Sequence, residues 1–584
     1  MALVTVDGRT QTFDPAYDPR DGSWFSIFGD DVRSQGDWGH WTGRGMNYDA
    51  QCGSCHDTDF RDGFDGNVHR PTMVEIGVGC EACHGPSARH AAGTGPPPVA
   101  RPGRETCAPC HSRRSALVDS PQPGAPLLDS VAPAAPDLSD AFWPDGRVRE
   151  EVFEENAFAG SRMAQMGVTC TDCHKPHDTA LRAEGDALCA TCHAATPRHD
   201  HHPDGTTSCV SCHMPTTTYM GRHERHDHAF VAPDPALTVS HGVPSACDAC
   251  HKEPSKLARA AAEWWGPADR PSMVRARALA NARRGEGRDA VLDVLANDPH
   301  PVWRARAHAW LDPWLGQPEV ERALLAGASD PDAATRAAAT AALGRGPVSP
   351  TVAAALERNV RDPVRLVRVE AQRAVRASRP VRSPDLADYV SYLDVQAEQP
   401  AAMAELAAWH TERGDPAAAV QILETAKVQD PRSPVIRHQL AVGLAATRRA
   451  TEAEAELRAA RALAPDDATI AAAHALALSE IGRLAEADAA LAASVALDPT
   501  DVRNWQNLAL MRMRDRGLNA ALQTLGDAEA ALVDDPMPPW LAASLLRDAG
   551  REAEARVRVT LALKRDPRHP GARALAQSLG VAPP

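Results

Sequence analysis

Aromatic residues make up only 4% of this 584-residue chain. Because aromatic side chains bury the most area, the cysteine-rich first half has no obvious core of ordinary side chains. No run of about 18 apolar residues occurs, which excludes a membrane-spanning helix. The first residues also lack the charged-then-apolar order of a signal peptide. Cysteine is absent after Cys250, where the sequence becomes rich in Ala, Leu and Arg.

All 14 cysteines form Cys-x-x-Cys pairs, seven in number, and histidine directly follows each pair. Such short pairs make a poor disulfide framework, and zinc sites of this spacing do not require the following histidine. Two thiols one helical turn apart, followed by an imidazole, are what covalent attachment of haem c requires. The sequence therefore predicts seven covalently attached haems c.

The predicted haem-attaching cysteines are Cys52, Cys55, Cys80, Cys83, Cys107, Cys110, Cys170, Cys173, Cys189, Cys192, Cys209, Cys212, Cys247 and Cys250. The predicted proximal iron ligands are His56, His84, His111, His174, His193, His213 and His251.

Net charge divides the chain in the same place as cysteine. Residues 1–251 hold 19 basic and 34 acidic side chains, whereas residues 252–584 hold 43 of each. The acidic excess argues against nucleic acid as a partner and favours basic protein surfaces. The alternative is that acidic charge only keeps the protein in solution.

Histidines outside the motifs could complete the iron coordination. Seven haems need at most seven distal ligands, so the supply permits two imidazoles on every iron, which closes the metal to substrate and suits electron transfer. The eleven available before residue 252 are His40, His69, His90, His177, His199, His201, His202, His223, His226, His228 and His241. The six later histidines are scattered singly and are expected to be surface or packing residues.

The segment from about 255 to 380 has an internal period of 32 residues. Asp-Pro recurs at Asp298, Asp330 and Asp362, and each Asp is followed six residues later by Arg and nine residues later by Ala. Asp-Pro suits the start of a helix, and small residues allow helices to stack closely. This pattern predicts HEAT-like helix pairs.

The segment from about 395 to 584 has a second period, of 34 residues. Loop prolines recur at Pro431, Pro465, Pro499 and Pro567, the last after two periods. Small residues fall where paired helices must touch, namely Ala419, Ala426, Ala453, Ala460, Ala487, Ala555 and Ala562, and Leu423, Leu457 and Leu491 fill the larger position. This pattern predicts tetratricopeptide repeats.

The motifs also resemble a known family. Cys80-Glu-Ala-Cys83-His84-Gly-Pro followed by His90 resembles an element of soluble multihaem cytochromes c, a superfamily that includes hydroxylamine oxidoreductase and the multihaem nitrite reductases. Nearly the whole chain resembles bacterial multihaem cytochromes with C-terminal tetratricopeptide repeats. The segments that carry this closer resemblance are His40–Arg44, Cys173–His177, Cys212–Pro215, Asp227–His228 and Pro244–Cys247.

The resemblance implies specific distal ligands. Histidines after a Cys-His-Gly-Pro or a Cys-His-x-Pro element commonly bind a different haem in such proteins, which implies distal roles for His90 and His177. Position in the family pattern implies the same for His40, His202 and His228, with a solvated loop histidine as the alternative for each.

The chain departs from its relatives in two ways. It has no Cys-x-x-Cys-Lys, so the lysine-ligated catalytic haem of typical pentahaem nitrite reductases is absent. A further haem motif expected upstream is also missing, and we expect the natural protein to extend before Met1 with an export signal and that eighth motif. The alternative is a mature protein without its cleaved leader.

These observations predict a mainly α protein with three parts. A loop-rich heptahaem domain spans 1–254, HEAT-like repeats span 255–380 and tetratricopeptide repeats span 395–584. The predicted function is electron transfer between redox partner proteins on the exported, periplasmic side, with the repeats docking a partner protein. The alternative is an oxidoreductase that acts on a small nitrogen or sulfur compound at one open haem.

Overall fold

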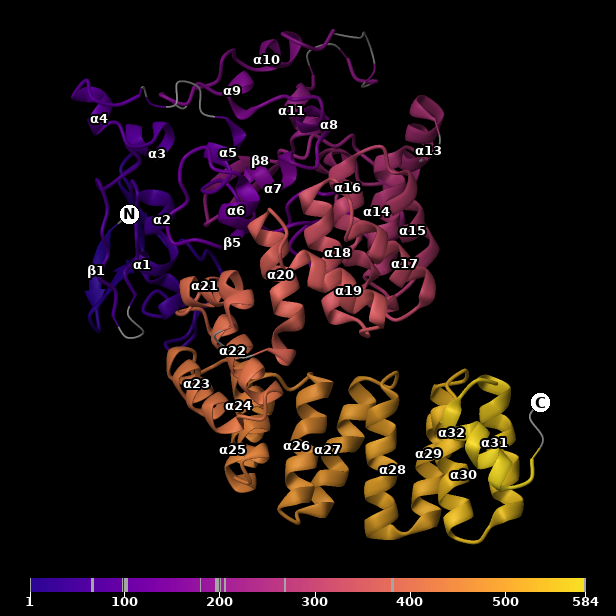
Figure 1. Cartoon of the computed structure of the whole chain (residues 1–584). Coiled ribbons are helices and arrows are strands. Elements are labelled where there is room, and N and C mark those ends of the chain that lie inside the picture. The colour runs from indigo at the N-terminus through magenta and orange to yellow at the C-terminus, as the bar shows by residue number, and fades with distance from the viewer. Residues whose placement is uncertain are drawn as a thin grey trace. The chain divides into compact units, whose positions relative to one another are not determined.

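The computed structural model describes residues 2–64, 68–96, 98, 103–178, 180–194, 199, 201–203, 206–266, 269–379 and 383–581. The protein is mainly helical, with 56% of its residues in helices and a few short strands (Figure 1). It forms two compact units: Met1–Gln35 with Gly39–Gln399, and Gly36–Trp38 with Pro400–Pro584. Within the described ranges, no helix combines the length and the apolar character that a membrane span requires.

The strands pair as four antiparallel hairpins, all in the first unit. The turn of the first hairpin is Asp7–Gly8, with φ of 50° and 76°, the two positive φ values that a tight two-residue hairpin turn needs. The pairs are β1 (Leu3–Val6) with β2 (Arg9–Thr12), β3 (Ala16–Asp18) with β4 (Ser23–Phe25), β5 (Arg114–Ala116) with β6 (Val131–Pro133), and β7 (Thr216–Tyr219) with β8 (His223–His226).

Helices up to residue 253 are only one or two turns long, too short to be stable alone. The longest, α12, begins after Asp234, whose side chain accepts from the amides of Ala236 and Leu237, and ends at left-handed Gly242. The helices are η1 (Arg44–Met46), α1 (Tyr48–Gln51), α2 (Gly53–His56), α3 (Cys80–His84), α4 (Ala88–Ala91), α5 (Arg104–Cys107), α6 (Leu127–Ser130), α7 (Glu154–Phe158), α8 (Arg162–Gln165), α9 (Cys170–Cys173), α10 (Asp186–Ala190), α11 (Cys209–His213), α12 (Pro235–His241) and η2 (Ala246–Ala249).

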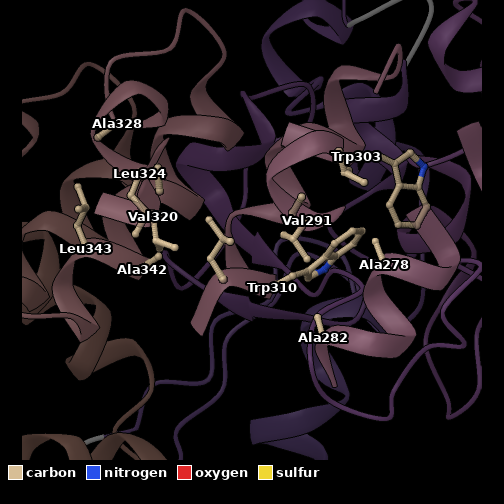
Figure 2. Packing of buried hydrophobic residues seen from close by; sticks show 14 of the residues in the cluster. Ala278, Ala282, Val291, Trp303, Trp310, Val320, Leu324, Ala328, Ala342 and Leu343 are labelled. Atoms are coloured by element: carbon tan, nitrogen blue, oxygen red, sulfur yellow. The ribbon is translucent and has the colours of Figure 1, made fainter. Parts of the chain in front are cut away.

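Longer helices follow, and those between residues 271 and 359 share one apolar core, in which Trp303 and Trp310 are the largest buried side chains (Figure 2). The helices are α13 (Pro254–Trp265), α14 (Pro271–Ala282), α15 (Arg288–Asn297), α16 (Pro301–Ala307), η3 (Ala309–Trp314), α17 (Pro318–Gly327), α18 (Ala333–Arg345), α19 (Pro350–Asn359), α20 (Arg365–Val375), η4 (Arg376–Ser378), η5 (Pro384–Leu386) and α21 (Ala387–Val395).

The 32-residue period has a structural cause. Arg336 donates to the carbonyls of Asp330 and Pro331 in its own repeat at 2.9 Å, and its guanidinium also binds the Asp362 carboxylate of the next repeat at 2.7 and 3.0 Å. Arg368 does the same with the carbonyls of Asp362 and Pro363 and the carboxylate of Asp388. Arg336 and Arg368 therefore each bind the loop of their own repeat and link it to the segment that follows.

The HEAT-like helices are joined to the segment that precedes them. Trp310 Nε1 donates to the carbonyl of Pro136 at 2.9 Å, and Arg306 Nη2 donates to the carbonyl of Asn156 at 2.8 Å. These donors are buried, so their bonds replace water that they could not otherwise reach. The boundary between the compact units thus falls at residues 399 and 400, because residues 255–399 pack on the motif-bearing segment.

The second unit is a run of antiparallel helix pairs. The alanines at the predicted contact positions, from Ala419 to Ala562, are all fully buried, and Leu423, Leu457 and Leu491 are at most 4% exposed. The predicted helical repeats are confirmed in this region. The helices are α22 (Pro400–Glu412), α23 (Pro416–Gln429), α24 (Pro434–Ala446), α25 (Ala450–Leu463), α26 (Ala468–Glu480), α27 (Leu484–Leu497), α28 (Val502–Arg516), α29 (Leu518–Ala531), α30 (Met537–Asp548), α31 (Glu552–Arg565) and α32 (Pro570–Ser578).

Candidate haem-binding sites

Each Cys-x-x-Cys-His motif folds as a single helical turn. In five motifs the histidine amide donates to the carbonyl of the first cysteine at 2.9–3.1 Å, and in the other two α3 and α11 span the motif. Positions i, i+3 and i+4 share one helix face, so both thiols and the imidazole lie on the same side of the turn. This arrangement fits a haem attached through two thioethers and bound from below by the imidazole.

Capping residues precede the helical turns of three motifs. The Thr169 amide donates to Asp172 and the Ser245 amide to Asp248, both at 2.7 Å, which are the N3 acceptors of capping boxes. Ser208 and Ser211 exchange equivalent bonds at 3.3 Å before α11. The variable residues inside these motifs therefore help to fold the turn that presents the thiols.

Thiols of different motifs also meet. The Cys55 side chain lies beside that of Cys110, and the Cys107 side chain lies beside that of Cys170. A third contact joins Cys189 and Cys209. These contacts place the first motif beside the third, the third beside the fourth, and the fifth beside the sixth. No disulfide joins any of the 14 cysteines.

Four motif histidines lie opposite a second histidine. The ring centroids are 6.1 Å apart for His84 and His177, 6.3 Å for His174 and His228, 6.4 Å for His213 and His199, and 6.0 Å for His251 and His202. The first three pairs have ring planes within 27° of parallel, and the fourth is tilted by 51°. His177, His202 and His228, three of the five histidines predicted as distal, are thus each brought to a motif histidine.

Backbone carbonyls set the tautomers of two of these rings. Nδ1 of His213 lies 3.3 Å from the carbonyl oxygen of Val231, and Nδ1 of His228 lies 2.9 Å from that of His226. A carbonyl only accepts, so each Nδ1 donates and each Nε2 carries the lone pair that a metal can bind. Burial lowers the pKa of both imidazoles, which favours the neutral form that acts as a ligand.

His111 has a carboxylate beside it instead. Its Nδ1 lies 3.5 Å from Oε2 of Glu154, the first residue of α7. Burial opposes the charge of Glu154, but hydrogen bonds from His111 and from the helix backbone outweigh that effect and lower the pKa of the carboxyl to about 2. In the described part of the chain, His56, His111 and His193 have no ring contact with a second histidine.

The two other predicted distal ligands lie elsewhere. His40 Nδ1 is 2.8 Å from Oγ1 of Thr42, and the His40 ring packs 6.0 Å from that of Trp41. His90 is exposed on α4. The ring contacts among the described residues include none that joins His40 or His90 to a motif histidine.

Sequence reasoning gave His199 no specific role, although the structure places it opposite His213. The available signal was the local density of histidine at His199, His201 and His202. His69 is used differently, since its Nε2 lies 2.6 Å from Oε2 of buried Glu398, which also binds Arg44. It belongs to a buried polar cluster.

Comparison with protein families gives two matches. Residues 163–198 match a family described as a doubled CXXCH motif, and residues 288–376 match HEAT repeats. The search of curated protein sequences found no significant match.

Solved structures that resemble the chain cover about a third of it. PilF of Pseudomonas aeruginosa is 22% identical, with a TM-score of 0.27, and the match covers 32% of this chain and 84% of PilF. MamA of Desulfovibrio magneticus RS-1 is 20% identical, with a TM-score of 0.24 and coverage of 28% and 94%. A thermophilic tetratricopeptide protein of Thermus thermophilus is 20% identical, with a TM-score of 0.25 and coverage of 31% and 98%. The family matches thus give the chain a doubled CXXCH motif, which suggests haem c attachment, and HEAT repeats, which suggest protein–protein interaction.

Proposed function

We propose that this protein is an exported multihaem c-type cytochrome that carries electrons between redox partner proteins. All seven motifs would attach haem c through their two cysteines and bind its iron through the adjoining histidine. Haem c supplies reversible one-electron transfer between ferric and ferrous iron. The repeats would dock a partner, and the acidic first half favours partners with a basic surface.

The spacing of the four histidine pairs is the main support. Two imidazoles that share one metal have ring centroids about 6 Å apart, because each metal–nitrogen bond is about 2.0 Å and each nitrogen lies at the near edge of its ring. The observed 6.0–6.4 Å fits this value. The ring centroids of a face-to-face stack are much closer, as the 4.2 Å between the ring centroids of His201 and Trp264 illustrates.

Two imidazoles on one iron leave no position for a substrate, which suits a carrier of electrons. His177, His228, His199 and His202 would serve as distal ligands opposite His84, His174, His213 and His251. The cysteine contacts between motifs support two groups of neighbouring haems, one at the first, third and fourth motifs and one at the fifth and sixth, because groups attached to adjacent side chains stay close to one another.

A second candidate function is oxidation or reduction of a small nitrogen or sulfur compound, as in the enzymes of the superfamily that the sequence resembles. The observation that favours it is the Glu154 carboxylate at His111 Nδ1, since a carboxylate raises the basicity of an iron-bound imidazole. His111 would then hold the haem at which such a compound binds.

The test uses full-length protein made with a cytochrome c maturation system and exported. Its intact mass should exceed that of the bare chain by seven haem masses, whereas a mass that shows zinc and no haem would end the proposal. In low-temperature electron paramagnetic resonance, His228→Ala should convert one low-spin haem to high spin. His226→Ala, two residues away on β8, is the matched control, and a His228→Ala spectrum identical to it would remove the pair assignment.

A further inference from the structure

His199, His201 and His202 lie close together in the sequence, between the fifth and sixth haem motifs. His199 faces His213 of the sixth motif at 6.4 Å, and His202 faces His251 of the seventh motif at 6.0 Å. Two proposed distal ligands therefore come from one short segment, three residues apart. A shift of that segment would affect both coordination sites at once.

The C-terminal end of α13 contacts this segment at two points. Trp265 Nε1 donates a hydrogen bond to the carbonyl of His199 at 2.8 Å. Trp264 stacks on His201, with ring centroids 4.2 Å apart and planes 12° from parallel, and Trp265 packs edge-on against the same ring at 6.0 Å. The two tryptophans thus contact the backbone of His199 and the side chain of His201.

His201 adopts a backbone conformation that needs such support. Its φ is 54°, in the left-handed region that L-residues rarely adopt. The stack on Trp264 favours the conformation in which His199 and His202 face different motifs. Trp264 itself is 45% exposed, so its ring is not a core side chain whose packing would explain it.

We propose that Trp264 and Trp265 are positioning residues for the distal ligands of two haems. The inference rests on the proposed function, because it takes His199 and His202 as iron ligands. Fixing the segment in advance raises the fraction of molecules in which both imidazoles can bind, since a ligand on an unconstrained loop must first be ordered. Neither tryptophan touches the iron in this scheme, and each acts through a histidine.

The experiment compares four variants and one control variant of the full haem-loaded protein by electron paramagnetic resonance and by carbon monoxide binding to the reduced form. His199→Ala and His202→Ala should each open one haem, which means that its iron loses the distal ligand, becomes high-spin and binds carbon monoxide. The double variant Trp264→Ala with Trp265→Ala should open one or both of these haems, and added imidazole should return them to low spin. Trp265→Phe, which keeps the ring but loses the N–H, should open fewer haems than the double variant.

The ligand assignment and the positioning role can fail independently. If neither His199→Ala nor His202→Ala opens a haem, the ligand assignment fails. If both do, but the tryptophan variants remain fully low-spin and closed to carbon monoxide, the positioning role fails and the assignment stands. Trp24→Ala, which removes a 58% exposed tryptophan from β4, controls for loss of a surface tryptophan and should open none.

Discussion

Trp303 donates its indole N–H to the carbonyl oxygen of Gly160 at 2.8 Å, across 143 residues of sequence. The guanidinium groups of Arg275 and Arg306 lie 4.5 and 4.9 Å from the Trp303 ring. The bond ties α16 to the loop between α7 and α8, just ahead of the fourth haem motif. The HEAT-like helices therefore pack against the motif-bearing segment and stabilise it, and they also form a repeat array of their own.

Trp303→Ala should lower the free energy of unfolding of the first unit by about 3–5 kcal/mol, because it leaves a large cavity and an unsatisfied Gly160 carbonyl. Urea unfolding followed by helical circular dichroism measures the effect. Trp24→Ala is the matched control, since that side chain is 58% exposed, and its cost should stay below about 1 kcal/mol. Equal losses in both variants would show that the Trp303 contact does not brace the unit.

Glu154→Gln should raise the reduction potential of one haem, the one held by His111. The carboxylate 3.5 Å from Nδ1 makes the imidazole a stronger donor and favours ferric iron, whereas a neutral amide does so less. Spectroelectrochemical titration should show one component moved to higher potential and the others in place.

Glu150→Gln serves as the control for this change. Glu150 precedes Glu154 in the same segment, but it pairs with Arg113 at 3.4 Å. Its titration should match that of the unaltered protein. A Glu154→Gln titration that superposes on the control would contradict the role of the carboxylate.

Asp388 should contribute an acid-sensitive part of the stability of the first unit. Burial opposes its ionisation, but hydrogen bonds from Arg368 at 2.7 and 3.2 Å outweigh burial and hold the pKa of the carboxyl below its usual value. The unfolded chain therefore binds the proton more readily, so this stability is present above about pH 4 and is lost as the pH falls through the folded pKa.

Asp388→Asn should remove about 1–2 kcal/mol at pH 7 and flatten the fall in stability below about pH 4. Urea midpoints measured from pH 3 to pH 7 test this expectation. Asp289→Asn, at an 83% exposed side chain that pairs with the adjacent Arg288, should leave the pH profile unchanged. The same profile for both variants would argue against the Arg368 pair as the cause.

Residues 400–584 should fold without the rest of the chain, because the apolar clusters that the structure describes among these helices are built from residues after 400. Far-ultraviolet circular dichroism of this fragment should show strong helix and cooperative unfolding in urea. A fragment of residues 255–399 should be less cooperative, since its Trp303, Arg306 and Trp310 lose their acceptors in the preceding segment. A weakly helical 400–584 fragment would contradict this division.

Local patterns in the sequence were enough to predict the motif turns and the repeats. A Cys-x-x-Cys-His motif closes its own helical turn through a bond from residue i+4 to residue i, and a capping residue such as Ser245 lies next to its motif. The 32-residue spacing of Asp and Arg likewise reflects bonds between neighbouring repeats, as between Arg336 and Asp362. Such contacts are short in sequence, so spacing alone reveals them.

Only the tertiary structure decided which histidines meet. His174 faces His228 and His84 faces His177, whereas His90 is exposed on α4 and His40 contacts Thr42 and Trp41. No pattern in the sequence indicated that Trp303 would contact Gly160. These pairings depend on how irregular segments pack around the motifs, and irregular segments carry no period from which a distant partner could be read.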